Sequence, residues 1–158
     1  MSGQGASGGK PRVLVLVGTR PEVIKMAPVV QALNRRTEEV ECRLALTGQH
    51  DELVHQVLDA FQLIPNLRLL PNVDLKVMRE GQDLYDLAHA FLNELRGVIR
   101  ESRPDMVLVQ GDTASVFFGS LVAFFEGFRG ERAALKVGHV EAGLRSRNKW
   151  APYPEEMF

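Results

Sequence analysis

The chain has 158 residues, of which 45% are hydrophobic and 25% charged, and its formal net charge is −1. This size and composition fit one globular domain with a single hydrophobic core. The near-neutral charge gives no electrostatic basis for binding nucleic acid or a membrane surface. The single cysteine, Cys42, excludes an intrachain disulfide, and no Cys/His cluster has the spacing of a zinc site.

The first eleven residues are rich in Gly and Ser and contain no apolar segment of the kind found in a secretory signal. We predict that residues 1–11 form a flexible leader and that residues 12–158 form the domain. No apolar run reaches the length of a transmembrane helix. Together these features predict a cytoplasmic location, and Cys42, within an apolar stretch, is expected to be buried and inert.

The first half of the domain begins with an apolar run, Val13 to Val17, that predicts a strand buried on both faces and ending at Gly18. Thr19 with Glu22 three residues later is a capping-box pattern, and Pro21 fits the first position of the following helix, which runs to about Arg36. The next predicted elements are a strand at 40–47, a helix at 51–61 and a short strand at 67–70.

The second half contains the clearest helix, at 83–103, where apolar side chains recur at helical spacing until Pro104. The elements predicted after it are a strand at 106–109, a helix at 115–128, a strand at 135–140 and a loop at 142–158. The phenylalanines of the helix at 115–128 lie at core spacing. The alternation of strands and helices predicts an α/β, Rossmann-like fold with a parallel sheet and helices on both faces.

In open parallel sheets, ligands bind beyond the carboxyl ends of the strands. Four segments follow strands here, and each combines a glycine with polar or ionisable side chains; they are residues 18–22, 48–50, 111–113 and 141–145. We therefore expect a substrate cleft at this edge. The first segment is neither a dinucleotide-binding glycine motif nor a P-loop, which argues against those two ligand classes.

Arg20 lies at a helix N-terminus, where it could hold an anionic group of a ligand or could simply be a surface arginine. Asp112 and Glu141 follow the last two strands and could act as paired acid and base. Asp112 could instead cap the next helix, whereas Glu141 has no obvious helix to cap. His50 follows the second strand and could contact the ligand, and His139, inside a strand, is expected to be structural.

Five motifs in order resemble those of the UDP-N-acetylglucosamine 2-epimerases. They are residues 17–28, with Gly-Thr-Arg-Pro-Glu and Ile-Lys-Met-Ala-Pro, then 47–50, 109–113, 139–145 and 152–157. The resemblance implies the N-terminal half of a glycosyltransferase-B type fold, in which two Rossmann-like domains enclose a cleft. It also implies interconversion of UDP-GlcNAc and UDP-ManNAc through removal of the C2 proton, elimination of UDP and its re-addition, without cofactor or metal, in the supply of cell-envelope polysaccharides.

By the same resemblance, Asp112, Glu141 and Glu155 share the proton transfers. Arg20 and Lys25 face the phosphates and stabilise charge on the departing UDP. The remaining substrate contacts implied by the motifs are Gln49, His50 and Arg145.

The family continues beyond Pro-Glu-Glu-Met into a second domain that carries most contacts to uridine and diphosphate, whereas this sequence stops at Phe158. We therefore expect the chain to be weak or inactive alone, and to act as a homo-oligomer or with a complementing C-terminal chain. The apolar helix at 115–128 is expected to leave an exposed patch. Two alternatives stay open: the hydrolysing branch of the family, which releases UDP and ManNAc, and a non-catalytic binding or assembly module.

Overall fold

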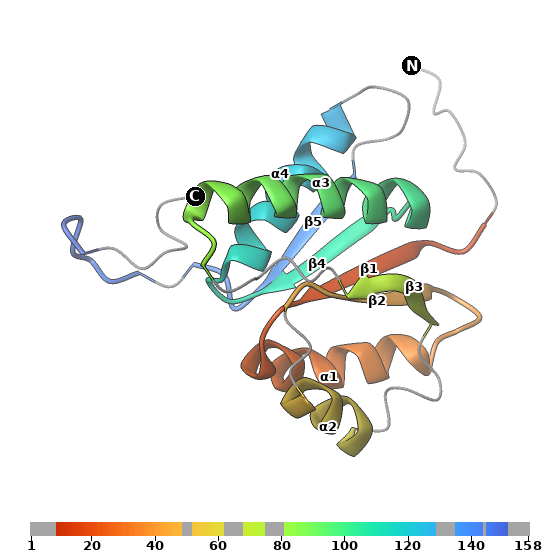
Figure 1. Ribbon diagram of the computed structural model, residues 1–158. Coiled ribbons are helices and arrows are strands. Elements are labelled where there is room, and N and C mark those ends of the chain that lie inside the picture. The colour runs from red at the N-terminus through yellow and green to blue at the C-terminus, as the bar shows by residue number, and fades with distance from the viewer. Residues whose placement is uncertain are drawn as a thin grey trace.

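The computed structural model describes residues 9–48, 52–61, 68–74, 81–128, 135–143 and 145–151 (Figure 1). The elements in chain order are β1 (Arg12–Val17), α1 (Arg20–Asn34), β2 (Glu41–Leu46), α2 (Glu52–Ala60), β3 (Arg68–Asp74), α3 (Leu84–Ser102), β4 (Met106–Gln110), α4 (Ala114–Phe128) and β5 (Lys136–Val140). Among the described residues, no helix combines the length and the apolar character needed to cross a bilayer. Most of the predicted leader lies outside the described residues.

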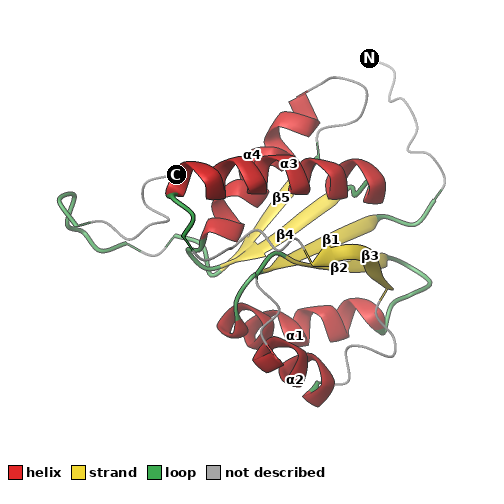
Figure 2. Cartoon of the chain, in the orientation of Figure 1, coloured by secondary structure: helices red, strands yellow, loops and turns green. Residues whose placement is uncertain are grey.

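The five strands form one parallel sheet in the order β3-β2-β1-β4-β5. Helices α1 and α2 cover one face and α3 and α4 the other, as Figure 2 shows. The predicted α/β fold with helices on both faces is therefore confirmed. Because the chain leaves β1 toward β2 and later returns to its other side with β4, the strand order reverses between β1 and β4. In sheets of this type, that reversal is where ligands bind.

The central strand β1 explains why its sequence is apolar without interruption. Leu14 and Leu16 pack into the core under α3 and α4, while Val13, Val15 and Val17 pack into the core over α1 and α2. A strand covered on both faces needs an apolar side chain at every position. Cys42 on β2 belongs to the second of these cores, and burial raises the pKa of its thiol to about 11, so it stays protonated and inert as expected.

Strand β3 is longer than predicted, because it continues through Pro71 to Asp74. The predicted strand stops at residue 70, just before Pro71, because proline cannot donate a backbone hydrogen bond. Pro71 is tolerated here because β3 is at the edge of the sheet and pairs only with β2, with a shift of register between Leu44 and Leu46.

Helix α1 begins with the predicted capping box. Thr19 is the extended N-cap residue, and the carboxylate of Glu22 accepts hydrogen bonds from the backbone N–H groups of Gly18 at 2.5 Å and Thr19 at 3.3 Å. The helix starts at Arg20, so Pro21 occupies the second helical position and not the first. The box fixes the path of the chain as it leaves β1.

Helix α4 corrects one prediction. Its buried face consists of Ser115, Val116, Gly119, Val122 and Ala123, whereas Phe124, Phe125 and Phe128 are 61%, 50% and 82% exposed. Both sets repeat at helical spacing, so periodicity could not separate them. The small residues form the buried face because they allow the helix to approach the sheet closely. A Cβ on Gly119 would lie 2.6 Å from Leu16 Cδ1. The core assignment of these phenylalanines was wrong, and the expected exposed patch is confirmed.

The loops that follow β1 and β2 touch backbone to backbone. A Cβ on Gly48 would lie 2.1 Å from the Gly18 carbonyl oxygen, and a Cβ on Gly18 would lie 2.2 Å from Ser115 Oγ. A side chain at Gly48 would require the backbone to move, because its first obstacle is the Gly18 carbonyl, whereas the obstacles at Gly18 are the hydroxyls of Ser115 and Thr47.

We predict that Gly48→Ala destabilises the fold by about 1–3 kcal/mol, the usual range for overpacking. The matched control is Gly97→Ala on α3, where an added Cβ meets nothing within 4 Å. That change should stabilise by roughly 0.5–1 kcal/mol, because alanine is the better helix former. Urea denaturation of both variants measures the difference in the free energy of unfolding. Equal midpoints for the two variants would contradict the close contact between Gly48 and the Gly18 carbonyl.

Candidate active site at the carboxyl edge of the sheet

At the carboxyl edge of the sheet, hydrogen bonds join the ends of β1 and β2 to the start of α4. The Thr47 N–H donates to the carbonyl of Val17 at 2.9 Å. The hydroxyls of Thr47 and Ser115 hydrogen-bond each other and are buried. These contacts hold the loops of three elements in fixed relative positions, as a preorganised site requires.

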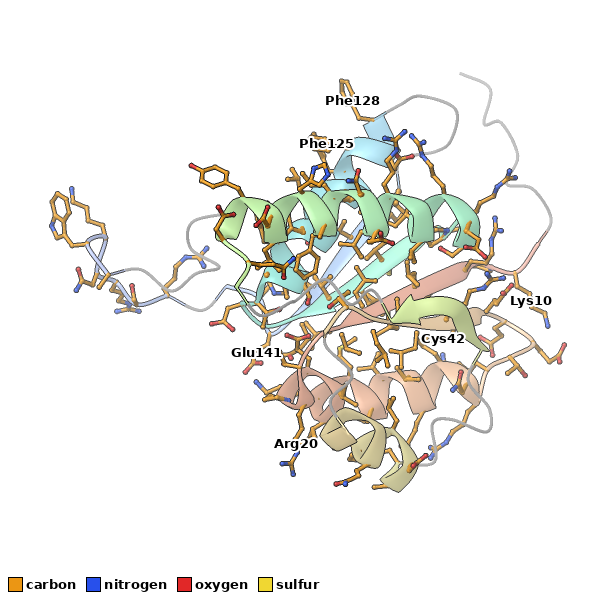
Figure 3. All side chains as sticks on the ribbon, in the orientation of Figure 1. Lys10, Arg20, Cys42, Phe125, Phe128 and Glu141 are labelled. Atoms are coloured by element: carbon orange, nitrogen blue, oxygen red, sulfur yellow. The ribbon has the colours of Figure 1, made fainter. Side chains whose placement is uncertain are left out.

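Glu141 stands at the centre of the polar contacts at this edge (Figure 3). It directly follows β5, and its backbone has φ of 64°, in the left-handed region that few residues with side chains adopt. Lys25 of α1 forms an ion pair with its Oε2 atom, and the Gln110 side-chain amide donates to the same oxygen at 2.5 Å. An unfavourable backbone conformation held by such contacts is common at functional sites.

The hydrogen bond from Lys25 lowers the pKa of Glu141; partial burial opposes this, while the charge of Lys25 and the amide of Gln110 add to it. The carboxylate is therefore ionised at neutral pH and is ready to accept a proton. The sequence identified Glu141 and Lys25 as separate candidates, and the structure brings them into direct contact.

Asp112 lies in the turn between β4 and α4, with its side chain exposed. Its carboxylate makes no hydrogen bond or ion pair to the described residues, so the helix-cap alternative finds no support there. The N–H groups of Val116 and Phe117, the third and fourth residues of α4, donate to the Thr113 carbonyl, each at 3.1 Å. Asp112 is thus open to a ligand.

His139 confirms its expected structural role. Its Nε2 atom lies 2.7 Å from the carbonyl oxygen of Gly111, which has a positive φ of 86°. The ring thereby ties β5 to the turn that carries Asp112, and it fixes the position of the two predicted carboxylates relative to each other.

The other predicted residues lie at the surface or outside the described part of the chain. Arg20, the first residue of α1, is exposed and points to solvent at the same end of the sheet as Glu141 (Figure 3). Arg145 is also exposed, in the segment that follows β5. Gln49, His50 and Glu155 lie outside the described residues, so their roles stay predictions.

Sequence reasoning missed Gln110, Thr47 and Ser115. Gln110 is 3% exposed and ends the otherwise apolar strand β4. The polar side chain at the end of an apolar strand is the one signal in the sequence that could have identified Gln110. A buried amide requires a hydrogen-bond partner, so such a residue indicates a polar contact nearby. Among the described residues, no group of three or more His, Cys, Asp or Glu side chains could hold a metal ion.

Comparison with known proteins assigns the family. The family model described as UDP-N-acetylglucosamine 2-epimerase matches residues 31–158. The UDP-N-acetylglucosamine 2-epimerase of Bacillus subtilis is 42% identical over 148 residues, which cover 94% of this chain and 35% of that protein. A putative UDP-N-acetylglucosamine 2-epimerase of Thermotoga maritima is 43% identical over 146 residues, with 92% and 35% covered.

Solved structures give the same result. A putative UDP-N-acetylglucosamine 2-epimerase from Listeria monocytogenes superposes with a TM-score of 0.78 at 41% identity, covering 94% of this chain and 36% of that one. The UDP-GlcNAc 2-epimerase from Neisseria meningitidis bound to UDP-GlcNAc gives 0.76 at 38% identity, covering 92% and 36%.

The chain spans about 35% of the length of the curated relatives it matches. Its sheet and helices correspond to the N-terminal half of the glycosyltransferase-B type fold. The matched residues include the turns that carry Asp112 and Glu141. The chain belongs to the UDP-N-acetylglucosamine 2-epimerase family.

Proposed function

We propose that this chain supplies acid–base groups for the interconversion of UDP-GlcNAc and UDP-ManNAc, as part of an isomerase. The observation that carries the proposal is the ionised Glu141 carboxylate, held by Lys25 and Gln110 at the carboxyl edge of the sheet. Family membership supports it, as do relatives crystallised with UDP-GlcNAc, from Neisseria meningitidis, and with UDP-GlcNAc and UDP, from Methanocaldococcus jannaschii.

In the proposed reaction, Glu141 accepts the proton from C2 of the sugar. The C1–O bond to UDP breaks, its electron pair leaves with the β-phosphate oxygen, and a C1=C2 double bond forms to give a 2-acetamidoglucal. A second acid delivers a proton to the opposite face of C2, and UDP adds back to C1. Because the C2 proton is weakly acidic, its removal depends on simultaneous stabilisation of the departing UDP.

The remaining predicted residues take roles that fit their places. Asp112, exposed and close to the turn held by His139, is suited to the second proton transfer, which it shares with Glu155. Arg20, at the N-terminus of α1, and Lys25, one turn later, offer positive charge to the diphosphate. Gln49, His50 and Arg145 complete the proposed substrate contacts. Residues 12–158 act in this proposal as one domain whose partner in catalysis is the remainder found in the longer relatives.

A chimera tests this division of labour. The 148 matched residues of the Bacillus subtilis relative are replaced by those of this chain, and the purified chimera is incubated with UDP-GlcNAc in D2O. Proton NMR should show deuterium at C2 and formation of UDP-ManNAc. Glu141→Gln in the chimera should slow exchange by about 100-fold or more, the usual contribution of a general base. The matched control is Glu38→Gln, which removes a carboxylate that is 93% exposed in an ion pair with Lys10, and it should leave the rate unchanged.

Other results would contradict the proposal. If the Glu141→Gln chimera exchanges the C2 proton at an undiminished rate, Glu141 is not the base that accepts this proton. Release of UDP and free ManNAc alone would place the chain in the hydrolysing branch. A folded chimera that binds UDP-GlcNAc without any exchange at C2 would favour a non-catalytic module.

We also propose that the chain associates with a second copy through the outer face of α4. Phe124, Phe125 and Phe128 form an aromatic ridge, in which the ring centroid of Phe124 lies 6.1 Å from those of the other two. Figure 3 shows Phe125 and Phe128 projecting away from the sheet. The neighbouring Arg100 and Glu126 neutralise each other through two hydrogen bonds of 2.9 Å. A twofold pairing would therefore set ridge against ridge without opposing like charges.

Sedimentation analysis tests the pairing. The chain should sediment as a dimer at micromolar concentration, and the triple variant with Phe124, Phe125 and Phe128 changed to Gln should sediment as a folded monomer. Tyr85→Gln is the matched control, because Tyr85 is an aromatic residue that is 85% exposed on α3. A wild-type chain that stays monomeric at high concentration, or a triple variant that still dimerises, would refute the interface.

A further inference from the structure

We propose that Gln110 is a positioning residue: together with Lys25 it fixes the Glu141 carboxylate through Oε2 and leaves Oε1 as the oxygen that takes the proton. The identity of the reaction in this inference rests on the proposed function. The contact between Gln110 and Glu141 is observed in the structure independently of it. Both donors reach the same oxygen, and Oε1 has no hydrogen-bond partner among the described residues.

The sheet itself places Gln110 beside Glu141. Gln110 is the last residue of β4 and pairs in register with Val140, the last residue of β5, so its neighbour across the sheet directly precedes Glu141. The amide is buried and needs a partner. Because an ionised carboxylate only accepts hydrogen bonds, the amide must present its N–H group to it.

The two donors have different properties. Lys25 supplies charge, but its side chain is 50% exposed on a flexible stem. Gln110 is neutral, short and enclosed, so it restricts the rotation of the carboxylate and donates at every pH. With Oε2 held on two sides, the open side of the carboxylate is Oε1.

Other ionisable groups lie on the elements and turns that meet at this edge of the sheet, and the test must leave them in place. They are Lys25 and Arg20 from α1, Asp112 after β4, His139 on β5 and Arg145 after β5. Of these, Lys25 is the one that contacts the Glu141 carboxylate among the described residues. The ring of His139 is bonded to the Gly111 carbonyl. Gln110→Leu therefore removes one donor from the carboxylate and no charge.

The test measures the pKa of the Glu141 carboxyl group in two variants of the chain, Gln110→Leu and the isosteric Gln110→Glu. The titration is followed by the carbon-13 chemical shift of the carboxyl carbon. Loss of a donor to the charged form should raise this pKa in the leucine variant, whereas in the glutamate variant the two adjacent carboxyls should titrate as a coupled pair with one raised apparent pKa. Gln31→Leu is the matched control: it removes a glutamine that donates to the Phe61 carbonyl at 2.9 Å, away from the site, and it should leave the Glu141 pKa unchanged.

The pH profile of C2 exchange in the chimera is the second readout. A base with a raised pKa becomes protonated at higher pH, so the acid limb of the profile should move to higher pH in Gln110→Leu and not in Gln31→Leu. If the Glu141 pKa stays unchanged in the folded Gln110→Leu variant, the positioning role is overturned. If the pKa rises but the acid limb stays, the contact stands and the assignment of Glu141 as the base, within the proposed function, fails.

Discussion

The carbonyl oxygen of Gly18 occupies the place where a side chain on Gly48 would stand, and the geometry of the candidate site follows from this contact. It brings the ends of β1 and β2 together without side chains, while the buried hydroxyls of Thr47 and Ser115 join them to the start of α4. Because β1 is the centre of the sheet, α1 and α4 begin on either side of one rigid edge. The chemistry at that edge therefore depends on packing and does not require loop closure to bring Lys25 and Glu141 together.

The backbone conformation and the side-chain contacts of Glu141 connect this packing to the proposed reaction. Its backbone adopts a conformation that costs about 1–2 kcal/mol for a residue with a side chain. The ion pair with Lys25 and the bond from Gln110 hold its carboxylate and keep it charged. An ionised, oriented carboxylate beside a cation suits removal of a proton next to a departing anion. The same arrangement would be of little value in a purely structural turn.

The sequence predicted the sheet well because β1 and α3 carry unambiguous patterns. It failed where two patterns of the same period competed, as on α4, and where proline was judged without knowing that β3 is an edge strand. The Lys25–Glu141 pair joins residues 116 positions apart. It depends on β5 lying beside β4 and on the second turn of α1, which carries Lys25, lying at the same edge; no local pattern encodes either. Gln110 was missed for the same reason.

The most direct measurement is a proton–nitrogen NMR titration of the labelled chain with UDP-GlcNAc up to millimolar concentration. If the carboxyl edge is the substrate site, the backbone amides of residues 18–25, 111–114 and 141–143 should shift together and saturate. The amides at the opposite ends of the strands, at Arg12, Glu41, Met106 and Lys136, should stay in place. Saturable shifts at that opposite end, or confined to the outer face of α4, would contradict the placement of the active site.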